Sequence, residues 1–346
     1  MINGALLGEA FLGWSLLVFA LLSLLTTPLM ILYARRFQLL DEPGQRRSHS
    51  GVIPRGGGAA AALVTLLAVL YFHATQQWAW ALIPPLFALG VVGWMDDHHP
   101  QTVRGRLLIQ VGSAVWLCFC LAPMHWLSDY WQWSGGLYYG AALLVFIVAV
   151  LTVIWLVNLY NFMDGSHGLA TGEAIFAGAG SFILLHESAP AAAYLGAILA
   201  ACMLGFLPWN FPKPKIFMGD VASGTLGLCV AAMAMLAGPD WWPVPLLLST
   251  TFIIDATFTL FHRMWRGEVW YQAHRQHVYQ RLIQQGWSHQ RVWLLYMLIN
   301  WLFILPVASW GVESPQRLFL ACLIIAIAVA LAWILAMRSL VHAAQA

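Results

Sequence analysis

The forty residues from 56 to 95 contain no Asp, Glu, Lys or Arg. A helix that crosses the hydrocarbon layer of a membrane needs about 20 mostly apolar residues, so this stretch is too long for a single crossing. A polar turn at 73–77 divides it, with Trp78 and Trp80 beside the turn. Because Trp side chains favour the membrane interface, the stretch predicts a hairpin of two membrane helices.

The same apolar pattern continues along the chain, which has 346 residues of which 61% are hydrophobic and 9% charged. Soluble domains carry about 25% charged residues, so lipid must solvate much of this surface. We therefore predict an all-α, polytopic integral membrane protein that forms one transmembrane domain over residues 1–346. The predicted crossings, about 11 in number, are 11–33, 57–73, 78–95, 107–126, 137–157, 168–186, 191–209, 221–238, 242–261, 292–310 and 318–337.

The positions of the basic residues predict the orientation of the chain. With eleven crossings, the loops that contain Arg55, Arg106, Lys213 and Arg275 all lie on one side, and of 16 Arg and Lys residues only Arg317 falls on the other. Basic residues gather on the cytoplasmic side of membrane proteins. The prediction is a multi-pass protein with a periplasmic N-terminus and a cytoplasmic C-terminus.

Two clusters of polar residues follow membrane segments at this predicted cytoplasmic side. Asp96 and Asp97 are adjacent at a helix C-terminus, where the two carboxylates repel each other and also face the negative end of the helix dipole. A nearby cation relieves both effects, and a solvated helix end is the alternative. Asn158, Asn161 and Asp164 are spaced by three, so they share one helix face. Their alternative is a hydrogen-bonded helix end.

A third cluster, residues 217–227, surrounds Asp220 at the start of a membrane segment. Asp at that place caps many helices, and the Gly, Ser and Thr residues beside it offer backbone N–H donors for an anion.

The fourth cluster is the loop from Arg263 to Arg281, which is basic and aromatic and contains His274, Arg275 and His277. The spacing of the two His residues suggests a metal pair, but the neighbouring Arg275 favours a phosphate clamp. The alternative is a loop that binds acidic membrane lipids.

Two acidic residues, Glu173 and Asp255, lie within predicted membrane segments. Ionisable groups are costly there and are candidates for function. We expect Asp255, near the cytoplasmic end, to pair with an Arg of the following loop. Both acids are also the basis of a competing hypothesis, in which the protein is a transporter and Glu173 and Asp255 are its coupling groups.

In this order, the clusters resemble the polyprenyl-phosphate N-acetylhexosamine-1-phosphate transferases, glycosyltransferase family 4. The resemblance also rests on the segments 41–43, 47–49 and 54–57, and the 274–281 segment is most similar to the branch that initiates O-antigen synthesis. It implies a membrane catalytic domain in the bacterial inner membrane. The implied substrates are a UDP-linked N-acetylated sugar and undecaprenyl phosphate. Membrane lipid is a further expected partner, no nucleic acid is expected, and a homodimer stays open.

The resemblance also implies roles for individual residues. Mg2+, with Mn2+ as the substitute, is expected on Asp220 and Asn161, and catalytic roles fall on Asp96, Asp97 and Asp220. Substrate contacts are expected from Arg55, Asn158, Asn161, Asp164, His274, Arg275 and His277. A phosphate monoester has a second pKa of about 6, so the acceptor needs little base. We therefore favour metal or acceptor positioning for Asp96 or Asp97, and a covalent aspartyl-phosphate route stays open.

One residue departs from the family pattern. His167 stands where relatives commonly have the second Asp of Asp-Gly-x-Asp-Gly, near the uracil. This difference puts base recognition in question, and it leaves an inactive homologue as a further alternative.

Overall fold

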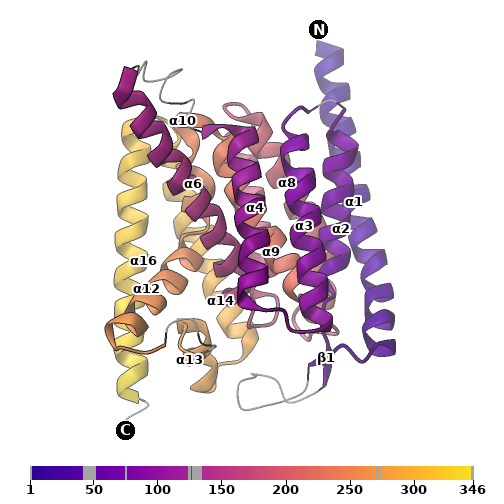
Figure 1. The fold of residues 1–346 in the computed structure, drawn as a ribbon, viewed down its shortest axis with the longest axis vertical. Helices are drawn as coiled ribbons and strands as arrows, with labels where there is room; N and C mark the ends of the chain where they lie inside the picture. Colours follow the sequence, from indigo (N-terminus) through magenta and orange to yellow (C-terminus); the bar gives the residue numbers. More distant parts are fainter. Residues whose placement is uncertain are drawn as a thin grey trace.

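The computed structural model describes residues 2–41, 52–74, 76–123, 126, 135–269, 272 and 274–343 as a bundle of helices (Figure 1). The segments 42–43 and 47–49, which belong to the predicted motif, lie outside this range. The helices are α1 (Ile2–Arg36), α2 (Gly58–Phe72), α3 (Ala79–His98), α4 (Val103–Leu121), α6 (Gly135–Met163), α7 (Leu169–Leu185), α8 (Pro190–Asn210), α9 (Asp220–Leu236), α10 (Gly238–Trp241), α11 (Pro243–Leu248), α12 (Thr250–Trp265), α13 (Val278–Gln284), α14 (His289–Ile299), the π-helix η2 (Asn300–Ile304), α15 (Leu305–Gly311) and α16 (Pro315–Ala343).

The prediction of an all-α, multi-pass membrane protein is confirmed. Among the described residues, seven helices are long and apolar enough to cross a membrane, and an eighth crossing is formed if the bent pair Gly238–Leu248 and Thr250–Trp265 counts as one. Three shorter apolar helices, α2, α7 and α9, occupy the places of three other predicted segments. Each predicted segment thus contains a helix, while the count of eleven crossings stays a prediction.

Two predicted segments contain breaks that hydropathy does not reveal. The segment 242–261 bends by 72° where α11 meets α12. Proline favours the first turn of a helix, and Pro243 begins α11 just before this bend. The segment 292–310 widens into η2, and single turns of π-helix often mark functional places in a helix.

Helix α9 lies inside the bundle, and every residue from Val221 to Met235 is buried. Membrane helices pack closely where small residues let their backbones approach. At Gly93 of α3, an added Cβ would lie 2.7 Å from the Cα of Val221. This close approach places the last turn of α3 beside the first turn of α9.

A short backbone pairing brings a further segment to this place. Strands β1 (Leu40–Asp41) and β2 (Ile53–Pro54) form an antiparallel pair. The carbonyl of Pro54 accepts a hydrogen bond from Phe217 N (2.8 Å), and Gly57 N donates to Phe217 O (2.8 Å). Residue 55 is therefore held beside the start of α9. Strand β1 lies near the end of the bundle at which α1 and α16 finish, opposite the end at which α1 begins (Figure 1).

Candidate active site

Carboxylates from three separate parts of the chain converge at this end of the bundle. Asp96 and Asp97 lie in the last turn of α3, Asp164 follows α6, and Asp220 begins α9. The Asp220 N–H donates to Asp97 Oδ1 at 3.3 Å. All four acids, with Asp41, line a cavity of about 370 Å³. The structure therefore brings together four of the acidic residues that the sequence singled out.

Arg55 neutralises the more deeply buried member of the Asp96–Asp97 pair. Its Nε and a terminal nitrogen lie 3.2 and 2.9 Å from Asp97 Oδ1, and the Asp97 side chain is 2% exposed. The second oxygen, Oδ2, is buried and has no hydrogen-bond partner in the described part of the chain. The Arg55 guanidinium therefore lies in the cavity wall and pairs with an acid, and the substrate contact expected of Arg55 stays a prediction.

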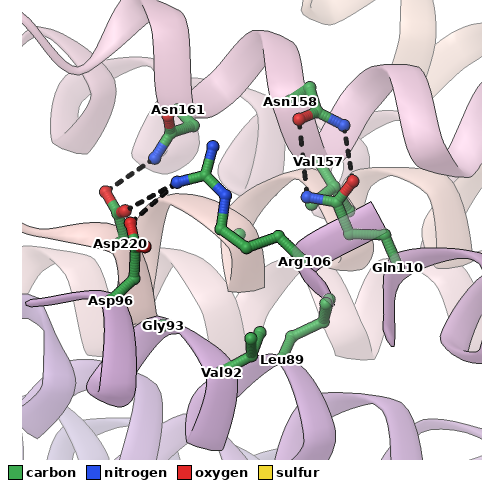
Figure 2. A pocket seen from close by; sticks show the side chains of 11 residues that line it. Leu89, Val92, Gly93, Asp96, Arg106, Gln110, Val157, Asn158, Asn161 and Asp220 are labelled. Atoms are coloured by element: carbon green, nitrogen blue, oxygen red, sulfur yellow. Dashed lines mark hydrogen bonds and ion pairs between the residues drawn. The ribbon is translucent and has the colours of Figure 1, made fainter. Parts of the chain in front are cut away.

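Arg106 is a site residue that the sequence analysis did not select. Its guanidinium lies 2.7 Å from Asp96 Oδ2 and 3.4 Å from Asp220 Oδ2, so it bridges the two acids (Figure 2). Asp96 also accepts the Gln101 N–H at 2.6 Å. In the sequence, Arg106 is one of many loop arginines. The one sequence signal for Arg106 was its place ten residues after Asp96, across the short loop between α3 and α4.

The two asparagines of the second cluster occupy different levels of α6. Asn161 Nδ2 lies 2.8 Å from Asp220 Oδ1 and 3.0 Å from Ser223 Oγ. Asn158 instead pairs with Gln110 of α4 through two amide hydrogen bonds of 2.8 and 3.4 Å (Figure 2). Both asparagines line a small pocket of about 30 Å³ beneath Arg106. Asn161 therefore belongs to the carboxylate site, and Asn158 braces α6 against α4.

Asp164 is half-buried in the cavity wall. Burial of the carboxyl group raises the pKa of Asp164 well above its ordinary value, and the nearby Asp220 and Asp97 raise it further. A backbone hydrogen bond from Gly219 offsets part of this effect. Gly219 has a φ of 82° and a ψ of 174°, a conformation almost confined to glycine. An added Cβ there would lie 2.7 Å from Asp97 Oδ2.

Part of the cavity lining is aromatic. His167, the residue that departs from the family pattern, stacks on His289 with ring centroids 3.6 Å apart. Ser166 Oγ lies 2.9 Å from His289 Nδ1, and Phe217 lies 5.9 Å from the His167 ring. All four residues line the cavity. A cavity lined by both stacked aromatic rings and carboxylates suits a ligand that has a ring and a cation-bound group.

The basic loop contributes less directly than its sequence suggests. His277 is 3% exposed and its Nδ1 lies 3.8 Å from Asp255, and it is not among the residues that line the cavity. Burial, together with the nearby His277 and Arg263, lowers the pKa of His274 to about 4, so His274 is neutral near pH 7. Gln280, from α13, does line the cavity. The binding roles predicted for His274, Arg275 and His277 stay predictions.

The oxygen atoms near Asp220 fit a Mg2+ ion whose remaining ligands come from the substrate and from water. In the described part of the chain, no three His, Cys, Asp or Glu side chains gather closely enough to hold a metal by themselves. Mg2+ usually binds through one or two carboxylates together with substrate phosphates and water. Asp220 and Asn161 supply oxygen donors, because an amide can turn either its oxygen or its nitrogen to the same place. The buried Asp97 Oδ2 adds negative charge beside them.

Comparison with known proteins supports the resemblance. Residues 78–238 match glycosyl transferase family 4. A probable undecaprenyl-phosphate N-acetylglucosaminyl 1-phosphate transferase of Bacillus subtilis is 26% identical over 81% of this chain and 79% of its own length. An undecaprenyl-phosphate alpha-N-acetylglucosaminyl 1-phosphate transferase of Thermotoga maritima is 30% identical over 63% of each chain. A phospho-N-acetylmuramoyl-pentapeptide-transferase of Synechococcus elongatus is 32% identical over 64% of this chain and 63% of its own.

The fold and the site define a multi-pass membrane protein with an acid-lined cavity at one end of its bundle. The family match runs from α3 to α9 and so includes Asp96, Asp97, Asp164 and Asp220. The matches to the Thermotoga and Synechococcus proteins span less than two thirds of those proteins. These matches support a likeness between this chain and the superfamily of polyprenyl-phosphate N-acetylhexosamine-1-phosphate transferases.

Proposed function

We propose that this protein transfers an N-acetylhexosamine-1-phosphate from a UDP-sugar to undecaprenyl phosphate and releases UMP. The names of its relatives support a sugar-phosphate transfer to a polyprenyl phosphate. As part of the proposal, the reaction initiates an O-antigen or another surface polysaccharide at the cytoplasmic face of the bacterial inner membrane. The N-terminus is then periplasmic and the C-terminus cytoplasmic.

The acid-lined cavity is the observation that supports this reaction most directly. Among the described residues that line it, five carboxylates accompany one guanidinium, that of Arg55. A pyrophosphate would be repelled from such a cavity unless a divalent cation entered with it. Asp220 and Asn161 are the residues that would hold Mg2+, or Mn2+ in its place. When bound there, the ion neutralises phosphate charge and stabilises the leaving group.

The chain's own residues then act mainly by position and charge. An oxygen of the acceptor phosphate attacks the β-phosphorus, the bond from that phosphorus to the bridging oxygen breaks, and UMP leaves with the electron pair. Because the acceptor phosphate is largely dianionic near pH 7, a general base adds little. Arg55 in the cavity wall and Arg106 between Asp96 and Asp220 are the cations that would balance negative charge on the oxygens of the transferred phosphate.

The described structure gives no support to the transporter alternative. Asp255 is 2% exposed and Glu173 is 0% exposed, and donors from the chain itself satisfy both carboxylates. Coupling groups of transporters line a path through the membrane. The expected pairing of Asp255 with an arginine is replaced by contacts with His277, Tyr296 and backbone.

The proposal is tested with the purified full-length protein in detergent, undecaprenyl phosphate, Mg2+ and a panel of UDP-linked sugars. Released nucleotide is identified by chromatography. The expected products are UMP and a lipid-linked sugar diphosphate. Sustained release of UMP should need both undecaprenyl phosphate and the correct UDP-sugar. Release of UDP, or a lipid with one phosphate, would contradict the proposed bond cleavage. Arg106→Ala should lower the rate of UMP release, and Arg104→Ala is its matched control, because Arg104 is exposed on the same helix.

A further inference from the structure

Asp255 lies on α12 in the interior of the bundle and joins four helices. Its Oδ1 accepts hydrogen bonds from Val278 N (3.0 Å), Trp333 Nε1 (3.1 Å) and Thr259 Oγ1 (3.2 Å). Its Oδ2 accepts the Tyr296 hydroxyl at 3.0 Å. The carboxylate therefore ties α12 to α13, α14 and α16 and uses its acceptor capacity within the protein.

The bond to Val278 fixes the start of α13. Val278 is the first residue of that helix, where backbone N–H groups have no partner within the helix. His277, just before it, is 3% exposed and has its Nδ1 3.8 Å from Asp255 Oδ1. A carboxylate at a helix N-terminus also interacts favourably with the helix dipole. The position of α13 thus depends on a residue of a membrane helix.

Helix α13 in turn contacts the candidate active site. Tyr279 is fully buried, and its hydroxyl donates to Phe162 O at 2.9 Å. At Gly165, an added Cβ would lie 2.2 Å from the Tyr279 hydroxyl oxygen, so α13 and the segment after α6 are in close contact. That segment carries Asp164, and Gln280 of α13 lines the same cavity.

We propose that Asp255 is a positioning residue for the part of the site that binds the UDP-sugar donor. It holds α13, and through Tyr279 it holds the segment 162–168 that carries Asp164 and the stacked His167. It touches no substrate itself. The kinetic consequence rests on the proposed transferase function, whereas the structural consequence does not. Loss of Asp255 should loosen the wall of the cavity and weaken donor binding more than acceptor binding.

Glu173 is a matched control, because it is an equally buried acid that does not support α13. Its carboxylate accepts Thr251 Oγ1 at 3.0 Å and Asn300 Nδ2 at 2.5 Å, and it is 0% exposed. These contacts join α7, α12 and η2. Glu173→Ala therefore removes a buried carboxylate network of the same kind while the described contacts of α13 stay in place.

The first test is hydrogen exchange of the purified full-length protein in detergent. Asp255→Ala should speed amide exchange in residues 279–284 and 162–168 at least tenfold, and Glu173→Ala should change it less than twofold there. Asp255→Asn should stay within threefold of the wild type, because its amide oxygen can accept the same N–H donors. Unchanged exchange in Asp255→Ala, or an equal change in Glu173→Ala, would overturn the proposal.

A second pair of variants covers the case in which Asp255→Ala does not fold. Val278→Pro removes only the N–H that Asp255 receives, since proline is well tolerated at the first position of a helix. Val278→Ala keeps that N–H and controls for the side chain. The proline variant should speed exchange in residues 280–284 at least tenfold relative to the alanine variant. Equal exchange in the two would overturn the proposal.

The kinetic test separates this inference from the proposed function. The variant used is Asp255→Ala if it folds, and otherwise Val278→Pro. In that variant the KM for UDP-sugar should rise at least tenfold, while the KM for undecaprenyl phosphate stays within threefold of the wild type. A fall in kcat with both KM values unchanged would overturn the positioning role. If exchange changes as expected but the wild type releases no UMP with any donor, the transferase proposal fails and the structural role of Asp255 stands.

Discussion

Replacing Arg55 with alanine would leave the Asp97 carboxylate without the cation that pairs with it. The Asp97 side chain is 2% exposed and the Arg55 side chain 32%. Removing one partner of a buried ion pair costs about 3–5 kcal/mol. Because Arg55 is one-third exposed, water screens part of the charge, and we expect the lower figure of about 2–3 kcal/mol for Arg55→Ala.

A double-mutant cycle tests whether this cost comes from the pair. Asp97→Asn removes the charge that needs a partner, so Arg55→Ala should cost much less in that background. The expected coupling energy is about 1.5–2 kcal/mol, within the range for residues in direct contact.

The measurement is unfolding of the purified variants in mixed micelles titrated with a denaturing detergent, followed by tryptophan fluorescence. Arg104→Ala, at an exposed position, should change the free energy of unfolding by less than about 0.5 kcal/mol. Additive effects of Arg55→Ala and Asp97→Asn, with a coupling energy below about 0.5 kcal/mol, would refute the ion pair as the reason for the loss.

Three further outcomes are expected. Asp220→Asn should abolish turnover at the Mg2+ concentration at which the wild type is fully active, while detergent stability is kept; near-normal activity of this variant at that same Mg2+ concentration would contradict its metal role. Gly219→Ala should lower turnover more than tenfold, because the backbone conformation at this position costs other residues about 1–3 kcal/mol and the added Cβ would lie too close to Asp97. Gly224→Ala is the control, because its added Cβ meets only ordinary contacts, and it should keep turnover within threefold. Single cysteines at positions 100, 214 and 276, in a variant without native cysteines, should be labelled from the cytoplasmic side, and labelling of any one from the periplasm would contradict the eleven-crossing topology.

The apolar segments could be predicted from sequence because lipid imposes a length and a composition on each crossing. What hydropathy could not supply was the shape of those segments. Hydropathy reports the mean polarity of a window of residues. The segments that contain the 72° bend between α11 and α12 and the π-helix at Asn300 therefore looked like uninterrupted apolar helices. The helices α2, α7 and α9 are shorter than the usual length of a membrane crossing, which hydropathy alone did not predict. In α9 every residue from Val221 to Met235 is buried, so packing inside the bundle accounts for its apolar composition.

The carboxylates of the site could also be predicted, because charged residues at the ends of apolar segments are few. Arg106 could not, since its pairing with Asp220 joins positions 114 residues apart and depends on the packing of α3 and α4 against α9. His277 shows the opposite difficulty. Its spacing from His274 suggested a shared ligand, but α13 begins at Val278, and the His277 side chain consequently faces Asp255.

The central claim concerns which phosphate bond is exchanged, and the reverse reaction tests it most directly. The proposed reaction breaks one phosphoanhydride and makes another, so its standard free energy should lie within about 1–2 kcal/mol of zero, where 1.4 kcal/mol is a factor of ten in the equilibrium constant. Purified protein given the lipid-linked sugar diphosphate and excess labelled UMP should therefore produce labelled UDP-sugar. Exchange that needs lipid would favour direct attack, and exchange without lipid would favour a covalent enzyme intermediate. A forward reaction that runs well while excess UMP yields no UDP-sugar would contradict the account.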